Sequence, residues 1–270
     1  VGPDGAGKTT IIRTLCGIYA PSSGNAEIFG YDTVKEINKI KNKIGYLSQR
    51  FSLYGDLSID ENLEFFAEIH NVKNFNSKRE ELLDFTRLKP FRNRFAEKLS
   101  GGMKQKLGLA CTLIHQPEII YLDEPTTGVD PVSRRDFWRI LSDLLKSNIT
   151  ILITTPYLDE VERCNRVGLL NNGSLMMVDT PVNLKSLLKD TIIEIVPDNV
   201  RNAFKIIKAS NKFRDIQAFG DRLNIFTSNY DEGMDLINST LNSNGLKVIH
   251  SRPIPPSLEN VFISLIEQKK

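Results

Sequence analysis

Cysteine, tryptophan and long apolar runs are scarce in this sequence. Its 270 residues include three cysteines and one tryptophan. Cys16, Cys111 and Cys164 are odd in number and lack metal-ligand spacing, which argues against a disulfide framework and indicates a reducing compartment. The longest run without a charged residue covers residues 14–26, whereas a transmembrane helix needs about 20 mostly apolar residues. We therefore expect a chain that does not cross a bilayer.

An excess of one charge sign is also missing. The 35 Lys and Arg residues nearly balance the 33 Asp and Glu residues, which leaves a formal net charge of +2. Such a weak field argues against a protein that follows the phosphate backbone of a nucleic acid. With 40% hydrophobic and 25% charged residues, the composition excludes a disordered or low-complexity chain. The length predicts one or two domains with a real hydrophobic core.

A phosphate-binding loop is the first positive signal. The pattern G-x-x-x-x-G-K-S/T is matched by Gly2, Pro3, Asp4, Gly5, Ala6, Gly7, Lys8 and Thr9. Glycines let backbone N–H groups turn inward around an anion, and the helix that follows adds partial positive charge at its N-terminus. Lys8 would then reach the β- and γ-phosphates, and the Thr9 hydroxyl would bind Mg²⁺. The alternative is a glycine-rich turn before an ordinary amphipathic helix.

This loop stands at the very beginning of the sequence. The first residue is Val1 rather than Met, and the loop begins at the next residue. The strand that usually precedes such a loop is therefore missing, and no secretory signal peptide is visible. These features predict a chain that is truncated or processed at its start.

An acidic pair follows a short apolar run. Residues 119–122 predict a parallel strand that is buried on both faces. Asp123 and Glu124 stand at its carboxyl end, where open α/β sheets bind their ligands. Asp123 would hold Mg²⁺, directly or through water, and Glu124 would orient and polarise the attacking water. The alternative is a strand followed by a solvated acidic turn, which we favour for an isolated pair but not beside a phosphate loop.

A third motif opens a helix. Ser100 is a good helix N-cap, and Gly101 and Gly102 expose backbone N–H groups at the start of a helix that we expect to reach residue 114. Such a helix start is a second anion site. The alternative is a plain capped helix. The two interpretations are compatible if the side of the helix packs in the core while its N-terminal end binds an anion.

In this order, the motifs resemble those of the nucleotide-binding subunit of ABC transporters. Five of them agree: Walker A, the Q-loop, the LSGGx signature, Walker B with its catalytic glutamate, and the D-loop. In this sequence they stand at Lys8 and Thr9, Gln49, residues 99–103, Asp123 and Glu124, and Asp130. Together they cover the chain from Gly2 to about residue 170.

The resemblance implies roles for individual residues. It assigns catalysis to Glu124, Gln49 and Lys8, and Mg²⁺ binding to Thr9, Gln49 and Asp123. Gln49 would also touch the attacking water, and Asp130 would reach across a dimer. The implied ATP contacts are Gly2, Pro3, Asp4, Gly5, Ala6, Gly7, Lys8, Thr9, Thr10, Ser100, Gly101, Gly102 and Asp130.

The resemblance also implies an α/β fold and a mechanism. The expected fold is a P-loop NTPase cassette over residues 1–185, with a helical subdomain at about residues 52–115. Two cassettes would close head to tail around two ATP molecules, with the phosphate loop of one facing the signature of the other. Hydrolysis would remove the bridging charge and relax the dimer. The expected partners are a second cassette and an integral membrane permease, and no nucleic acid. The expected place is the cytoplasmic face of the cell membrane, as the peripheral subunit of an exporter.

One departure from the family concerns its switch histidine. This residue follows the strand after Walker B, here residues 150–154, and the aligned position is Pro156. Proline has neither an imidazole nor a backbone N–H, so it cannot contact a γ-phosphate as histidine would. The simplest interpretation is a strand-end turn that tolerates proline. A second is a transport ATPase with impaired hydrolysis. Another is a nucleotide-sensing, regulatory dimerisation module with weak hydrolysis. A soluble ABC ATPase of translation or DNA repair is a fourth, but such proteins generally carry tandem cassettes or long helical insertions, and their partners demand basic patches.

The residues from 190 to 270 have a different character. Their patterns follow the order βαββαβ, which predicts a small ferredoxin-like α+β domain. The strands are expected at residues 192–196, 215–219, 222–227 and 247–251, and the helices at 200–210 and 231–243. Residues 256–262 begin a last helix and resemble the closing motif of ATPases from bacterial multidrug or antibiotic exporters. We see no catalytic constellation in this domain.

Helix caps and aromatics mark the stretch between Gln49 and the acidic pair. Capping boxes are matched at Ser58 and at Ser77. Phe51 and Tyr54 follow the Q-loop, either as core residues or as walls of a groove for a permease helix. The three histidines have no metal-ligand spacing, and we interpret them as structural or solvated.

Overall fold

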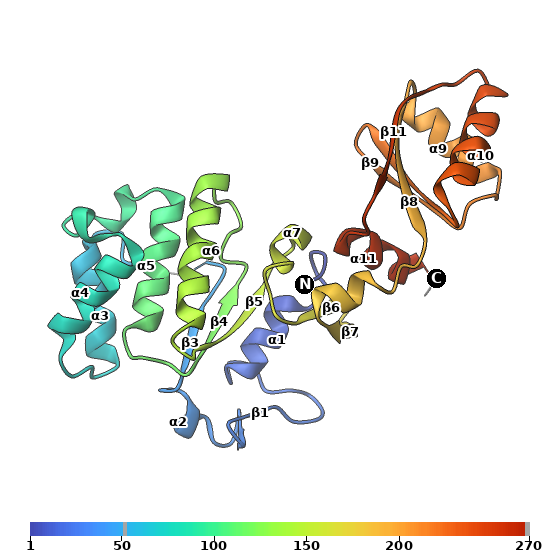
Figure 1. Cartoon of the computed structure of the whole chain (residues 1–270). Coiled ribbons are helices and arrows are strands. Elements are labelled where there is room, and N and C mark those ends of the chain that lie inside the picture. Colours follow the sequence, from blue (N-terminus) through green and yellow to red (C-terminus); the bar gives the residue numbers. More distant parts are fainter. Residues whose placement is uncertain (51–52, 268–270) are drawn as a thin grey trace. The chain divides into compact units, whose positions relative to one another are not determined.

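The chain folds as two compact units (Figure 1). The computed structural model describes residues 1–50 and 53–267, so Phe51 lies outside the described residues. The first unit consists of residues 1–156 and 172–174, and the second of residues 157–171 and those from 175 onward. Among the described residues, no helix is both long and apolar enough to cross a membrane.

Three parallel strands form the sheet of the first unit. They are β3 (Ile44–Leu47), β4 (Ile119–Asp123) and β5 (Thr150–Thr154), in the order β3-β4-β5. β4 is an apolar run whose Ile120, Tyr121 and Leu122 are fully buried, as parallel strands covered on both faces require. The pairing aligns Asp123 with Thr154. The carboxyl ends of β4 and β5 therefore lie side by side, and both strands are confirmed as predicted.

Helices and one hairpin complete the first unit. They are α1 (Lys8–Leu15), the hairpin of β1 (Glu27–Ile28) and β2 (Tyr31–Asp32), α2 (Ile37–Ile40), α3 (Ile59–Ile69), α4 (Phe75–Thr86), the short 3-10 turns η1 (Lys89–Phe91) and η2 (Ala96–Lys98), α5 (Gly101–Leu113) and α6 (Pro131–Leu145). α3, α4 and α5 pack on one another, and α5 also packs on β3 and α6 (Figure 1). α1 packs on β4, with Ile12, Cys16 and Tyr121 in one core. Burial raises the pKa of the Cys16 thiol to about 12, so this cysteine is an inert core residue.

One of the two predicted capping boxes is confirmed and the other is wrong. At the start of α3, the backbone N–H of Glu61 donates to the Ser58 hydroxyl at 3.2 Å, and the Ser58 N–H donates to the Glu61 carboxylate at 2.7 Å. Ser77, in contrast, lies inside α4, which begins at Phe75. The reason is Asn74, which takes a left-handed conformation with φ 60°. Asparagine tolerates this region, so the helix begins directly after it.

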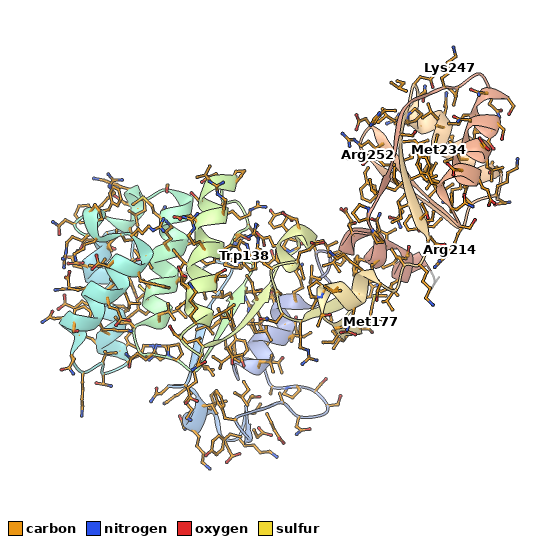
Figure 2. All side chains as sticks on the ribbon, in the orientation of Figure 1. Trp138, Met177, Arg214, Met234, Lys247 and Arg252 are labelled. Carbon is orange, nitrogen blue, oxygen red and sulfur yellow. The ribbon has the colours of Figure 1, made fainter. Side chains whose placement is uncertain are left out.

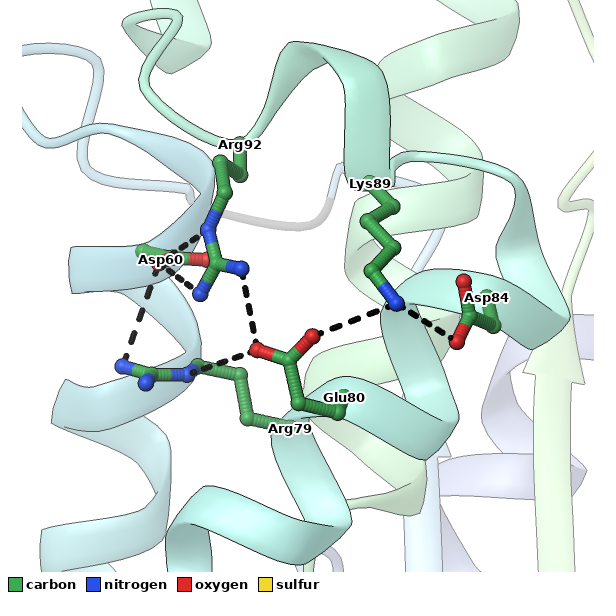
Figure 3. A network of polar contacts seen from close by, with 6 residues as sticks. All are labelled: Asp60, Arg79, Glu80, Asp84, Lys89 and Arg92. Carbon is green, nitrogen blue, oxygen red and sulfur yellow. Dashed lines mark hydrogen bonds and ion pairs between the residues drawn. The ribbon is translucent and has the colours of Figure 1, made fainter.

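A network of ion pairs joins α3, α4 and η1 (Figure 3). Arg92 is its centre, because its guanidinium binds Asp60 at 2.6 Å and Glu80 at 2.9 Å. Arg92 also holds the pKa of the Glu80 carboxyl below its ordinary value. Arg79 and Lys89 extend the network on either side, and Lys89 reaches Asp84 at 2.9 Å. Such partly exposed pairs contribute little individually, but together they link α3, α4 and η1 to one another.

The second unit has several short elements before its sheet and one helix after it. They are α7 (Leu158–Val161), the hairpin of β6 (Val167–Asn171) and β7 (Ser174–Asp179), α8 (Pro181–Lys185) and α11 (Leu258–Glu267). The hairpin turns at Asn172 and Gly173, both with positive φ, as the predicted turn requires. α11 packs on both α7 and α8, which is why residues 157–171 and 175–185 belong to the C-terminal unit in this packing. The predicted division into residues 1–185 and 190–270 stays a prediction.

The rest of the second unit is the predicted βαββαβ fold. Its elements are β8 (Thr191–Pro197), α9 (Val200–Ala209), β9 (Asp215–Phe219), β10 (Arg222–Thr227), α10 (Tyr230–Asn242) and β11 (Val248–Ile254). The four strands are antiparallel in the order β11-β8-β10-β9. α9 and α10 bury Ile193, Ile195 and Ile225, and Met234 of α10 points toward the sheet (Figure 2). The topology confirms the ferredoxin-like order.

Candidate functional site

The phosphate loop is a tight turn that leads directly into α1. Gly5 and Gly7 have φ of 78° and 100°, which glycine adopts without steric cost. Gly7 is the N-cap of α1, and no side chain caps this helix, so its first N–H groups point toward the loop without a side-chain acceptor. The loop is supported from the turn before β7, because the Gly173 N–H donates to the Ala6 carbonyl at 3.0 Å.

Lys8 is buried in the middle of this loop. Its side chain is 5% exposed, and its ammonium donates to the carbonyls of Gly2 at 2.9 Å and Pro3 at 3.0 Å. It also forms an ion pair with Glu124 at 3.0 Å, while the exposed Asp4 carboxylate lies 3.6 Å away. The ammonium is thus surrounded by oxygen acceptors, and phosphate oxygens belong to the same chemical class.

Glu124 is the point at which three predicted site elements meet. Its carboxylate is nearly buried, and one oxygen, Oε1, pairs with Lys8. The other oxygen, Oε2, accepts a hydrogen bond from Gln49 Nε2 at 3.0 Å and one from the Thr127 hydroxyl at 3.3 Å. The backbone of Glu124 has φ 49°, a left-handed conformation that is uncommon outside glycine. This strained turn directs the Glu124 carboxylate toward the phosphate loop. Neighbouring groups must stabilise the turn, because the conformation is unfavourable by itself.

Asp123 lies at the end of β4 and is fully buried. Its Oδ1 accepts a hydrogen bond from the Thr154 hydroxyl at 2.7 Å. Its Oδ2 is buried and has no hydrogen-bond partner among the described residues. A buried carboxylate oxygen without a partner is costly unless a cation or water binds it. Asp123, with the Thr9 hydroxyl and Gln49 as further oxygen donors, therefore fits the hard, oxygen-seeking Mg²⁺.

The remaining residues of the loop differ in exposure. Gly2 and Ala6 are buried, Gly7 and Thr9 are half-buried, and the exposed positions are Pro3, Asp4, Gly5 and Thr10. The structure thus brings Lys8, Gln49, Asp123 and Glu124 together at the ends of β3 and β4. That these residues bind ATP and Mg²⁺ stays a prediction.

The signature residues lie at the start of α5 and differ from one another. Ser100 is exposed and caps the helix, because its hydroxyl accepts the Met103 N–H at 3.3 Å. Gly101 is exposed, but Gly102 is buried against α6. A Cβ atom on Gly102 would stand 2.4 Å from the Cβ atom of Ser133. Packing against α6 therefore requires glycine at position 102. This requirement is independent of any role of Gly102 in nucleotide binding.

We expect Gly102→Ala to destabilise the protein. The added methyl group overlaps Ser133 and forces α5 and α6 apart, and overpacking of this kind costs about 1–3 kcal/mol. Gly101→Ala is the matched control, because the nearest atom to a Cβ there is the Gly128 carbonyl oxygen at 3.9 Å. Thermal unfolding of both variants tests the expectation. Equal melting temperatures for the two variants would contradict it.

Asp130 caps α6 within its own chain. Its exposed carboxylate accepts hydrogen bonds from the N–H groups of Val132 at 3.1 Å and Ser133 at 3.0 Å. The bonds from Ser133 hold the pKa of Asp130 below its ordinary value. Ser133 is also the residue against which Gly102 packs. The first turns of α5 and α6 are therefore in direct contact. The predicted contact of Asp130 across a dimer stays a prediction.

Pro156 follows β5 and is half-buried. It stands two residues after Thr154, whose hydroxyl reaches both acidic residues. The position predicted for the switch residue is therefore next to the site, and proline there offers no N–H donor and no polar side-chain atom.

Three residues make contacts in the site that were not predicted from the sequence. Thr154 binds Asp123 and Glu124, Thr127 binds Glu124, and Gly173 binds the phosphate loop. Thr127 begins the D-loop match that ends at Asp130, and a hydroxyl three residues after the predicted catalytic carboxylate was a usable signal. The other two depend on strand register and on a turn far along the sequence.

The histidines do not build a metal site. The rings of His70 and His115 stack with centroids 3.9 Å apart, and burial lowers the pKa of both. The Nε2 atom of His115 lies 3.0 Å from the Ile44 carbonyl oxygen. Within residues 1–50 and 53–267, no cluster of three or more His, Cys, Asp or Glu side chains is arranged to hold a metal.

Comparison with known sequences places these features in one family. A sequence profile of the ABC transporter family matches residues 1–127. The probable multidrug ABC transporter ATP-binding protein YbhF of Escherichia coli is 48% identical over 183 residues, which is 67% of this chain and 32% of that protein. This chain thus spans about a third of the length of YbhF. The linearmycin resistance ATP-binding protein LnrL of Bacillus subtilis is 30% identical over 272 residues, which is 98% of this chain and 88% of that protein.

Solved structures show the same similarity. The ATP-binding cassette MJ0796, in a dimeric post-hydrolysis state bound to ADP and Pi, superposes with a TM-score of 0.60. The match is 26% identical and covers 66% of this chain and 82% of that chain. The P-loop NTPase cassette fold expected from the sequence is confirmed.

Proposed function

The chain belongs to the family of ABC transporter ATP-binding proteins, and we propose that it binds and hydrolyses ATP to drive a separate membrane permease. The observation that carries this proposal is the meeting of Lys8, Gln49 and Glu124 beside an uncapped helix N-terminus. A buried cation, an amide and a carboxylate at an N–H-lined loop are the groups that phosphoryl transfer to water needs.

The ion pair between Lys8 and Glu124 suggests how ATP prepares the site. The β- and γ-phosphates carry more negative charge than one carboxylate, so they compete for the Lys8 ammonium. Glu124 Oε1 is then released, while Oε2 stays bound to Gln49 and Thr127. The released oxygen can accept a proton from the attacking water. Mg²⁺, held by Asp123, Thr9 and Gln49, would neutralise charge on the phosphates.

A second cassette would complete the site. The Ser100 and Gly101 end of α5 is exposed, and the solved relative MJ0796 is dimeric. We propose that this end faces the phosphate loop of a second copy, where the N–H groups of α5 add to those of α1. Asp130 would contact the partner from the neighbouring helix start. Closure of the dimer would then depend on the γ-phosphate, and hydrolysis would release it.

We further propose a permease partner and a place on the cytoplasmic face of the membrane. The support is the family membership and the names of YbhF and LnrL, one a probable multidrug transporter protein and the other a resistance protein. These names favour export of a drug-like compound. ATP turnover of the purified chain, measured with and without a co-expressed permease, tests the proposal. A chain that binds no Mg²⁺-ATP and releases no phosphate in either case would overturn it.

Tyr54 is the residue through which we test the permease contact. The residue is 45% exposed, and its ring packs edge-on against Phe65 of α3, with centroids 4.5 Å apart. We expect Tyr54→Asp to reduce co-purification with the permease, because it places a charge on an apolar docking surface. Phe29→Asp is the matched control, since Phe29 is also 45% exposed but lies at the β1–β2 hairpin. Equal losses for the two variants would contradict a specific role of Tyr54.

Pro156 favours a second candidate, a nucleotide-sensing module with weak hydrolysis. If proline limits turnover because it offers the γ-phosphate no donor, Pro156→His should hydrolyse ATP faster than the natural chain. A positioned hydrogen-bonding side chain is worth about 10²-fold or more in favourable cases. Phosphate release at saturating Mg²⁺-ATP measures the effect. Unchanged or lower turnover in Pro156→His would remove the argument for impaired hydrolysis.

A further inference from the structure

Thr154 joins the two acidic residues of the site through one hydroxyl group. The Thr154 Oγ1 donates its proton to Asp123 Oδ1 at 2.7 Å and accepts the backbone N–H of Glu124 at 3.1 Å. The same N–H also donates to the Thr154 carbonyl at 3.0 Å. Thr154 is 8% exposed, so water does not replace these bonds readily. The contact bridges β4 and β5 where the two strands end.

The hydroxyl fixes which oxygen of Asp123 is left to bind a cation. A carboxylate has two oxygens with about four acceptor positions. Oδ1 is occupied by Thr154, and Oδ2 is buried without a partner among the described residues. Without the hydroxyl, both oxygens would be buried and unsatisfied, and the carboxylate could rotate toward other donors. The bond from Thr154 therefore sets the direction in which Oδ2 points.

The same hydroxyl also holds the turn at Glu124. The left-handed backbone there (φ 49°) persists only if surrounding bonds over-determine it. The Glu124 N–H is shared between the carbonyl and the hydroxyl of Thr154. Loss of the hydroxyl removes one of these two anchors and lets the carboxylate of Glu124 drift from Lys8 and Gln49.

We propose that Thr154 is a positioning residue for ATP hydrolysis, which sets both the metal-binding oxygen of Asp123 and the aim of Glu124. It acts through these two residues and touches neither phosphate nor water itself. The inference rests on the proposed function, because it requires that Asp123 and Glu124 belong to a Mg²⁺-dependent nucleotide site. A merely structural role, in contrast, would tie β4 to β5 without affecting the response to Mg²⁺.

The test compares Thr154→Val, which keeps the shape and removes the hydroxyl, with Thr154→Ser, which keeps the hydroxyl. Loss of an outer partner of a metal-binding carboxylate typically weakens metal affinity or activity about 10–100-fold. We expect Thr154→Val to need about tenfold more Mg²⁺ for half-maximal binding of a fluorescent ATP analogue, with kcat lowered by a similar factor. Binding of the analogue in EDTA should change less than about twofold, and Thr154→Ser should stay close to the natural chain.

Thr86→Val is the matched control for loss of a buried threonine hydroxyl. Thr86 is fully buried, and its hydroxyl donates at 2.6 Å to the Leu82 carbonyl within α4. This variant should keep the natural Mg²⁺ dependence. If Thr154→Val does not fold, Thr154→Ala takes its place in the same titration.

Two results would overturn the inference. One is that Thr154→Val, or Thr154→Ala in its place, has the same Mg²⁺ dependence and the same kcat as the natural chain. The other is an equal loss of analogue binding with Mg²⁺ and with EDTA, which indicates general damage to the fold. A natural chain that binds Mg²⁺ and the analogue but releases no phosphate would contradict the proposed hydrolysis, while the Mg²⁺ titration would still decide the role of Thr154.

Discussion

Replacing Glu124 with glutamine is expected to lower ATP turnover by about 10²–10⁴-fold, because loss of a positioned general base has effects of this size. Glutamine keeps the shape of the side chain, so Gln49 and Thr127 retain an acceptor. The negative charge that pairs with Lys8 disappears, so the carboxylate no longer competes with the phosphates for the Lys8 ammonium. ATP binding should therefore be unchanged or tighter, and phosphate release and ATP binding measured on the same sample separate the two effects.

Glu118→Gln is the control for loss of a glutamate charge. Glu118 is about half exposed and pairs with Lys43 at 2.8 Å, outside the site. Its turnover should equal that of the natural chain. Turnover of Glu124→Gln within about threefold of that control would contradict the role of Glu124, since a base contributes far more.

Replacing Lys8 with alanine is expected to weaken ATP binding by about 10–100-fold. The estimate follows from hydrogen bonds to charged groups, which contribute about 1.5–3 kcal/mol each. The variant also leaves the buried Glu124 carboxylate without its cation, and breaking a buried pair in this way destabilises a fold. Isothermal titration with Mg²⁺-ATP measures the affinity, and thermal unfolding measures the stability.

The double variant Lys8→Ala, Glu124→Gln separates these two effects. It removes the orphaned negative charge, so we expect it to regain stability relative to Lys8→Ala. It should not regain ATP affinity, because the ammonium is still absent. Natural ATP affinity in either variant would contradict the assignment of Lys8 to the phosphates.

The sequence predicts most of the elements that carry the site. The apolar run before Asp123 identifies β4, because parallel strands are buried on both faces, and the glycines before Lys8 identify the turn into α1. Strand and helix periods likewise predict the βαββαβ order of the last residues, which the strand pairing confirms. The capping box at Ser77 failed because it competes with Asn74, and a local pattern does not show which of two helix starts wins.

The contacts between distant residues could not be predicted. The bond from Thr154 to Asp123 requires knowing that β4 and β5 pair in a register that aligns these two residues. The bond from Gly173 to Ala6 joins a turn to a loop more than 160 residues away in the sequence. Gly102 illustrates a third limit. Its family motif suggests binding, but its contact with Ser133 shows a packing requirement that only the arrangement of α5 and α6 reveals.

The most direct test of the account mixes two variants that should be inactive alone. Lys8→Ala disables the phosphate loop, and Ser100→Arg disables the signature with a bulky charge. If two copies close head to tail, each mixed dimer contains one site with both natural halves. Random pairing then predicts recovery of about one quarter of the natural ATP turnover, because half of the dimers are mixed and each has one intact site of two. No recovery, at chain concentrations at which the natural protein hydrolyses ATP, would contradict a site built by two copies of this chain.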